Sequence, residues 1–199
     1  NVQDIALASD GSIVAIGRHQ GQVTVDAPSN TAGGIPDAVT PRIFFSRLSS
    51  DGQLSQIVSN DWQSSLQMRI TSTGENFFVV ANGTSSFVID EETTIGSPTG
   101  GPFFAFLELS SNLDVISAMG GNAGYVSFAD IISDDTGNIL IPNWRDASGA
   151  DYDPNPNTTY FERNLPADPS GWSDGAVVKL RPIRPGDSVK LLDGNFERN

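Results

Sequence analysis

The stretch ISDDTGNILI, residues 132–141, decides the fold of this chain. Short apolar runs flank a central Asp-Asp-Thr-Gly-Asn segment, a pattern typical of two strands joined by a tight turn. Similar stretches occur earlier, as ALASDGSIVAI at residues 6–16 and ITSTGENFFVV at residues 70–80. One hairpin pattern therefore occurs three times in 199 residues, which makes internal repeats the first question about the fold.

The turn glycines of these stretches are evenly spaced. Gly11, Gly74 and Gly137 give intervals of 74 − 11 = 63 and 137 − 74 = 63. A second element follows each hairpin: IFFSRLSSDGQLSQI, FFAFLELSSNLDVI and GAVVKLRPIRPGDSVKL. In each of these elements a charged residue stands directly before a Leu in a largely apolar run, as expected for a strand with one face in water. The three charged residues are Arg47, Glu108 and Lys179.

Each unit therefore predicts four strands, at residues 5–8, 13–17, 43–48 and 54–59 in the first. The chain is expected to be all-β, and four antiparallel strands repeated at a long period are typical of β-propeller blades. We expect one propeller segment over residues 1–199, with units at about 1–63, 64–126 and 127–199. Propellers have four to eight blades, so the three would belong to a longer propeller or be completed by other chains. A β-sandwich or an open array of sheets is the alternative.

The whole chain resembles, as three copies, a bacterial β-propeller repeat family, the SBBP-type repeats, and the resemblance is strongest in the third unit. These repeats combine a Gly-Gly segment, an apolar-Asp-Gly-Asn hairpin, a long polar loop and an Ala-Phe-Val-x-Lys-Leu strand. The second copy departs from the pattern at Thr73 and Glu108, and the first has Ser12 for the turn Asn. The resemblance implies a secreted or surface-anchored bacterial protein. The matching residues are Gly120, Gly121, Asp135, Gly137, Asn138 and residues 176–180.

Composition excludes several classes of function. The net charge of −13 and the pI near 4.2 argue against binding nucleic acid or anionic membranes. No Cys is present, so thiolate metal sites and a Cys nucleophile are excluded. No apolar run is long enough to span a membrane, and the first residues, NVQDIALASDG, contain no signal core, which predicts a mature or internal fragment.

Long loops separate the second and third strands of each unit, at residues 18–42, 84–102 and 145–174. They are expected on one common side, as the default binding surface. The third contains DYDPNPNTTYFE, whose oxygen-bearing residues have the spacing of an EF-hand-type calcium loop. Pro156 replaces the turn Gly and no helix flanks the segment, so a solvated polar loop is the alternative. The candidate calcium ligands are Asp151, Asp153, Asn155, Asn157 and Glu162.

Aromatic residues in and around the third loop are candidate ligand-binding residues, because such rings stack on sugars. Packing of these rings onto the sheet is the alternative. His19, the single histidine, is expected on a surface loop, and the turn acids Asp10, Asp51, Asp134 and Asp135 are expected to bond backbone amides. The aromatic candidates are Trp144, Tyr152, Tyr160 and Trp172.

These features favour a non-enzymatic, extracellular, cell-surface or periplasmic scaffold. It would present loops for adhesion or dock as a peripheral subunit, binding a protein or glycan partner. An acidic surface also suits a basic partner. A carbohydrate-binding module is the first alternative, and a propeller hydrolase or lyase is the second, although no catalytic residues stand out. The sequence predicts no cofactor apart from the possible calcium.

Overall fold

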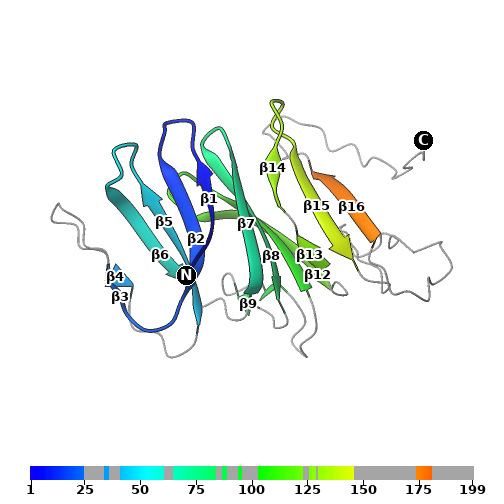
Figure 1. Cartoon of the computed structure of the whole chain (residues 1–199), viewed down its shortest axis with the longest axis horizontal. Coiled ribbons are helices and arrows are strands. Elements are labelled where there is room, and N and C mark those ends of the chain that lie inside the picture. The colour runs from blue at the N-terminus through cyan, green and yellow to red at the C-terminus, as the bar shows by residue number, and fades with distance from the viewer. Residues whose placement is uncertain are drawn as a thin grey trace.

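The computed structural model of the chain is built from antiparallel sheets (Figure 1). It describes residues 1–24, 34–35, 41–60, 65–83, 87–88, 94–95, 103–122, 126–128, 130–145 and 174–180. Every regular element among these residues is a strand, and the described part of the chain contains no helix that could cross a membrane. The predicted all-β class is confirmed.

The first sheet contains the four strands expected of the first unit. Each strand pairs antiparallel with its neighbour, in the order β1-β2-β5-β6. The predicted bounds differ from the observed ones by a few residues, mainly because β1 begins three residues earlier, at Val2. The strands are β1 (Val2–Leu7), β2 (Ile13–His19), β5 (Arg42–Leu48) and β6 (Leu54–Asn60).

The second sheet has the same meander, in the order β7-β8-β11-β12. Its two central strands, NFFVVANG and FFAFLEL, are almost continuously apolar. Such sequences are expected where both faces of a strand are buried. The strands are β7 (Ser65–Thr73), β8 (Asn76–Gly83), β11 (Phe103–Leu109) and β12 (Val115–Asn122).

The third sheet is centred on β15 (Ile139–Arg145). On one side of β15, β16 (Asp174–Leu180) pairs along the whole length of β15. On the other side, β13 (Val126–Phe128) pairs with the end of β15 and β14 (Ile132–Ser133) pairs with its beginning. Two short hairpins interrupt the long loops. They are β3 (Val23–Thr24) with β4 (Gly34–Ile35), and β9 (Phe87–Val88) with β10 (Thr94–Ile95).

Four hairpin turns, at residues 8–12, 49–53, 110–114 and 134–138, share one construction. In each, the first N–H donates to the fifth carbonyl and the fourth N–H donates to the first carbonyl. The fourth residue has a positive φ, which glycine adopts without strain. This residue is Gly11, Gly52, Leu113 or Gly137.

The turn between β7 and β8 is of another type. Thr73 pairs directly with Asn76, which leaves a loop of Gly74 and Glu75 alone. The three glycines are therefore equally spaced by 63 residues although Gly74 belongs to a different kind of turn from Gly11 and Gly137.

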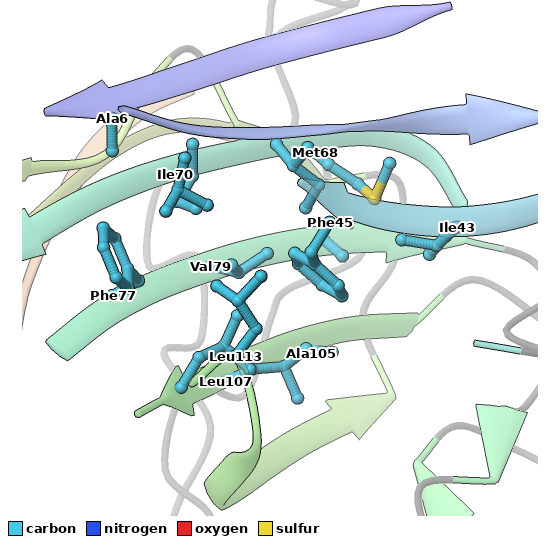
Figure 2. Close-up of a cluster of buried hydrophobic side chains, with 14 of the residues drawn as sticks. Ala6, Ile43, Phe45, Met68, Ile70, Phe77, Val79, Ala105, Leu107 and Leu113 are labelled. Atoms are coloured by element: carbon cyan, nitrogen blue, oxygen red, sulfur yellow. The ribbon is translucent and has the colours of Figure 1, made fainter. Parts of the chain in front are cut away.

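Each sheet has a front face, turned toward the sheet that follows it in the chain, and a rear face. On the front of the first sheet lie Val14, Ile16 and Phe45, which pack against Phe77, Val79, Leu107 and Leu109 on the rear of the second. Figure 2 shows Phe45 of the first sheet pointing toward Val79 and Leu107 of the second. Full burial of side chains of this size contributes about 1.5–3 kcal/mol each, so this junction is the centre of the core.

The second sheet is buried on its front face as well. Phe78 and Phe106 stack there with ring centroids 5.7 Å apart, on the side where the third sheet stands (Figure 1). Ile139 and Ile141 are buried on the rear of the third sheet, as the alternation in ISDDTGNILI predicted, and Leu140 between them is half-buried.

The first strand of each sheet, β1, β7 or β14, lies beside the first strand of the next. Leu7, Ser72 and Ser133 hold the same position, because they pair with Ile13, Phe77 and Ile139 near the start of the following strand. The Ser72 hydroxyl donates to the carbonyl of Leu7 at 2.5 Å, and the Ser133 hydroxyl donates to the carbonyl of Ser72 at 2.8 Å. One hydrogen bond is thus repeated at both junctions.

One expectation about the faces was wrong. Arg47 and Glu108 do not lie on a face in water, because the front faces of the first and second sheets are covered by the sheets that follow. Arg47 is only 18% exposed, and its guanidinium lies 6.0 Å from the ring centroid of Phe77 in the second sheet. The described residues form three sheets side by side and no closed ring, so the propeller stays a prediction.

Leu113 supplies a test of the turn geometry. It has a φ of 62° and is 2% exposed, so backbone strain opposes side-chain burial. We expect Leu113→Ala to destabilise the fold by about 2–5 kcal/mol, because it removes packing and keeps the strain. Leu113→Gly should be more stable than the Ala variant by about 1 kcal/mol, because the strain is relieved. Urea unfolding measures both, and an Ala variant more stable than the Gly variant would contradict the geometry.

Candidate functional site

The tight turns of all three sheets lie at one edge, which we call the turn edge (Figure 1). Its turns are residues 8–12, 49–53, 73–76, 110–114 and 134–138. The chain leaves β2, β8 and β15 at the opposite edge, where the long loops begin. The sequence predicted the binding surface on the side of the long loops, whereas the polar clusters that the structure describes are at the turn edge.

Asp134 is the main carboxylate of its turn. It accepts hydrogen bonds from the Thr136 hydroxyl at 2.6 Å and the Asn138 side-chain amide at 2.7 Å, and from both backbone N–H groups at 2.9 Å. These bonds, from Thr136 first and then Asn138, hold the pKa of Asp134 well below its usual range. The predicted turn role is confirmed for Asp134, as it is for Asp10 and Asp51. The family resemblance had matched Asp135 to the turn Asp, but the bonded carboxylate is Asp134.

Arg47 fills the turn edge between the first and second sheets. Its guanidinium donates to the Asp10 carboxylate at 2.7 Å and to the Ser12 hydroxyl at 2.9 Å, and it also donates to the carbonyl of Ser111. Hydrogen bonds to Ser12, and then the charge of Arg47, lower the pKa of Asp10. An arginine of the chain itself therefore neutralises Asp10 at the first junction, and a hollow of about 220 Å³, which Glu75 also lines, remains there.

Glu108 stands at the corresponding position between the second and third sheets. It precedes the shared five-residue turn by the same two places as Arg47. Its carboxylate accepts from the Asn76 side-chain amide at 2.7 Å and from the Ser117 hydroxyl at 3.3 Å. A hollow of about 960 Å³ opens there, which is more than four times the volume of the hollow at the first junction.

We call this hollow the acidic groove. Four carboxylates line it, and no Lys or Arg is among the lining residues that the structure describes. Phe78 and Ile116 supply apolar surface in the same hollow. Negative charge in a concave site attracts cationic groups more strongly than the same charge spread over a convex surface. The carboxylates are Glu75, Glu108, Asp134 and Asp135.

The sequence reasoning missed this groove. Its acids come from residues 75, 108 and 134–135, and only the packing of the second sheet beside the third brings them together. One signal was available, since the charged position of the repeated strand changes from Arg47 to Glu108. That change reads as a departure from a family pattern, but in the structure it converts a neutralised junction into an acidic one.

His19 differs from its expectation as a surface-loop residue. It ends β2 and is 6% exposed. Its Nε2 lies 2.9 Å from the Ser59 hydroxyl and its Nδ1 lies 3.0 Å from the carbonyl of Gly21. A Ser–His pair of this kind can activate a nucleophile, but the ring is enclosed by Phe44 and neither hollow described above includes it. We assign His19 a structural role.

The other predicted site residues lie outside the described part of the chain. This holds for the calcium candidates Asp151, Asp153, Asn155, Asn157 and Glu162, and for Tyr152, Tyr160 and Trp172. Trp144 belongs to β15, where its backbone pairs with Ser127 and Gly175. Among the described residues, no group of three or more His, Asp or Glu side chains is arranged to hold a metal ion. Calcium binding and sugar binding by the third loop stay predictions.

Comparisons with known proteins add no family. No protein-family model matches the chain, and no curated protein is significantly similar to it. The resemblance to SBBP-type repeats therefore stays a prediction from the quoted motifs.

Asp134 gives the site a pH test. Because the pKa of Asp134 is lower in the folded chain than the ordinary aspartate value of 3.8, its bonds stabilise the fold above that value. The stabilisation is lost as the pH falls through the lowered pKa. Asp134→Ala should therefore lower the Tm at pH 7, with a difference from the parent that narrows steadily below pH 4.

Asp135→Ala is the matched control, since Asp135 is the exposed neighbour in the same turn. Thermal scans by circular dichroism from pH 2 to pH 7 measure both variants. Equal effects of the two substitutions, or a difference for Asp134→Ala that is independent of pH, would refute the assignment.

Proposed function

We propose that this chain is a non-enzymatic interaction scaffold whose acidic groove binds a basic segment of a protein partner. The observation that carries the proposal is the change from Arg47 to Glu108 at equivalent positions of two junctions. At the first junction an arginine of the chain itself neutralises the turn edge. At the second junction the carboxylates are present and the arginine is missing, so a partner would supply it.

The first junction shows what such a contact requires. A carboxylate, a hydroxyl and a main-chain carbonyl converge on the Arg47 guanidinium, which is a strong arrangement because each hydrogen bond involves a charged donor. The acidic groove offers the same kinds of acceptor. Glu75 and Asp135 supply carboxylates and Ser133 and Thr136 supply hydroxyls. Ile116, which is 53% exposed, offers apolar surface to the aliphatic part of an Arg or Lys side chain.

The overall charge of −13 supports the same class of partner. Acidic surfaces steer basic partners toward encounter, and the affinity falls with ionic strength because the charges are screened over about 8–10 Å. We place the scaffold outside the cytoplasm, in a secreted or surface-exposed setting. That location rests on the family resemblance.

We further propose that the three sheets are successive blades of a β-propeller. Two complete meanders with the same strand order, a third sheet beside them, and the serine–carbonyl bond repeated along β1, β7 and β14 support this architecture. The blade arrangement explains why the acidic groove lies between sheets, since adjacent turns of neighbouring blades meet at one rim.

A fluorescein-labelled octalysine peptide tests the groove by fluorescence anisotropy. We expect binding to the parent chain that weakens as NaCl is raised from 20 to 300 mM. The double variant Glu108→Gln with Asp135→Asn should weaken binding at least about tenfold, because two charge-assisted contacts of about 1–1.5 kcal/mol each are lost. Glu108→Arg should abolish binding by placing a cation where the first junction has Arg47.

The matched control is Asp51→Asn with Asp114→Asn. It removes the same two charges from exposed turn residues that do not line the groove. It should retain binding within about twofold, since only long-range screened charge is lost. Equal weakening by both double variants would show that net charge alone attracts the peptide, and would overturn the groove as the site.

A further inference from the structure

The rear face of the first sheet is apolar and no described sheet covers it. β1, β2 and β5 place Val2, Ile5, Leu7, Ile13 and Phe44 on this face, as the strand register shows. Val2, Ile5 and Leu7 are 53%, 59% and 65% exposed. Three of the five large apolar side chains that stand exposed in the described part of the chain therefore belong to one strand and one face.

The same position is buried in both of the other sheets. Ile5 on β1, Ile70 on β7 and Ile131 directly before β14 occupy equivalent places, two residues before Leu7, Ser72 and Ser133. Ile70 is 3% exposed and Ile131 is 2% exposed, because a preceding sheet packs on each. Among the sheets that the structure describes, only the first has none before it, so the exposure of Ile5 identifies half of an interface that occurs twice in the described part of the molecule.

The front face of the third sheet is the other half. Ile132 and Leu140 pair across β14 and β15 on that face, and Ile132 is 48% exposed. The corresponding residues of the first sheet, Ala6 and Val14, are 7% and 0% exposed because the second sheet covers them.

Asp130 supplies an independent match to this interface. Asp4 lies at the first junction, where one oxygen accepts the N–H of Ile5 at 2.9 Å and the other accepts the N–H of Ile70 at 2.9 Å in the next sheet. Asp130, 126 residues later (130 − 4 = 126), repeats the local bond by accepting the N–H of Ile131 at 2.8 Å. Asp130 is exposed. It holds the position in the third sheet that corresponds to Asp4 in the first, and Asp4 uses that position to accept a hydrogen bond from the following sheet.

We propose that a second copy of this chain occupies both end faces, with the front face of each third sheet packed on the rear face of the other copy's first sheet. Such a head-to-tail contact uses two different surfaces and closes when the rotation returns to the start. Two copies of three sheets make six, within the four to eight of closed propellers. The inference rests on the proposed blade arrangement and extends it. The rear face of the first sheet and the front face of the third sheet correspond to the two surfaces that pack together at each junction within the chain.

The mass of the 199-residue chain in solution tests the proposal. Analytical ultracentrifugation should give about 42 kDa (2 × 21.1 kDa) for the parent. Ile5→Lys and Ile132→Glu should each raise the dissociation constant at least about tenfold, because each buries a charge against an apolar surface. Ile116→Lys is the control, since Ile116 is 53% exposed on β12 and outside both end faces, and its dimer should persist.

Mixing the two end-face variants distinguishes a head-to-tail contact from any other. An Ile5→Lys chain with an Ile132→Glu chain forms one unaltered contact and one Lys–Glu contact, so the mixture should recover the dimer. If the rear faces of two first sheets packed on each other, the Ile132→Glu variant would form a dimer by itself, and mixing it with the Ile5→Lys variant would not restore dimers of the latter. Either result would overturn the head-to-tail arrangement. Circular dichroism of each variant confirms that it is folded.

A monomeric parent at 100 μM, or a dimer indifferent to Ile5→Lys, would overturn the second copy as the occupant. So would assembly beyond two copies, because an open chain of contacts is not a closed ring. A monomer that still binds octalysine in the groove would leave the proposed function standing, so the two failures are distinguishable.

Discussion

The second sheet is apolar on both faces, and the rest of the structure depends on this constraint. Its rear face carries Phe77 and Leu107 and its front face carries Phe78 and Phe106, all almost fully buried. A sheet of this kind is stable only between two others, because exposure of either face would cost about 25 cal/mol for each Å² of apolar surface. The first and third sheets take their places on either side of it, and no further sheet in the described part of the chain covers the outer face of either.

Polar groups at the junctions determine how the sheets are aligned. Gln3 and Asp4 accept the N–H groups of Met68 and Ile70, so the free edge of β7 is satisfied by side chains of the preceding sheet. Apolar packing alone tolerates sliding, whereas buried donors of this kind accept only one alignment without losing a hydrogen bond. The turns of neighbouring sheets consequently meet at one rim, where Arg47 neutralises one junction and Glu108 leaves the other acidic.

Local structure was largely predictable from the sequence, because strands and hairpins depend on short-range patterns. Period-two runs located the strands of the first sheet, and the glycines at positions 11 and 137 marked turns that require a positive φ. Two local features were out of reach. Leu113 takes the left-handed conformation in place of glycine because burial in the core compensates for its strain, and the shorter turn at Gly74 has the same spacing as the longer turns beside it.

The candidate site was hidden because it is made by packing between units. An alternating pattern shows that a strand has two faces, but it does not show whether the polar face meets water or the next sheet. Arg47 and Glu108 were assigned to water for this reason. Once the junctions are known, the residue type at that position distinguishes them. Arg47 binds a turn carboxylate of its own chain, whereas Glu108 adds one more carboxylate to those of the turns. Sheets of the same strand order can thus hold a junction that an arginine closes and a junction that a glutamate leaves acidic.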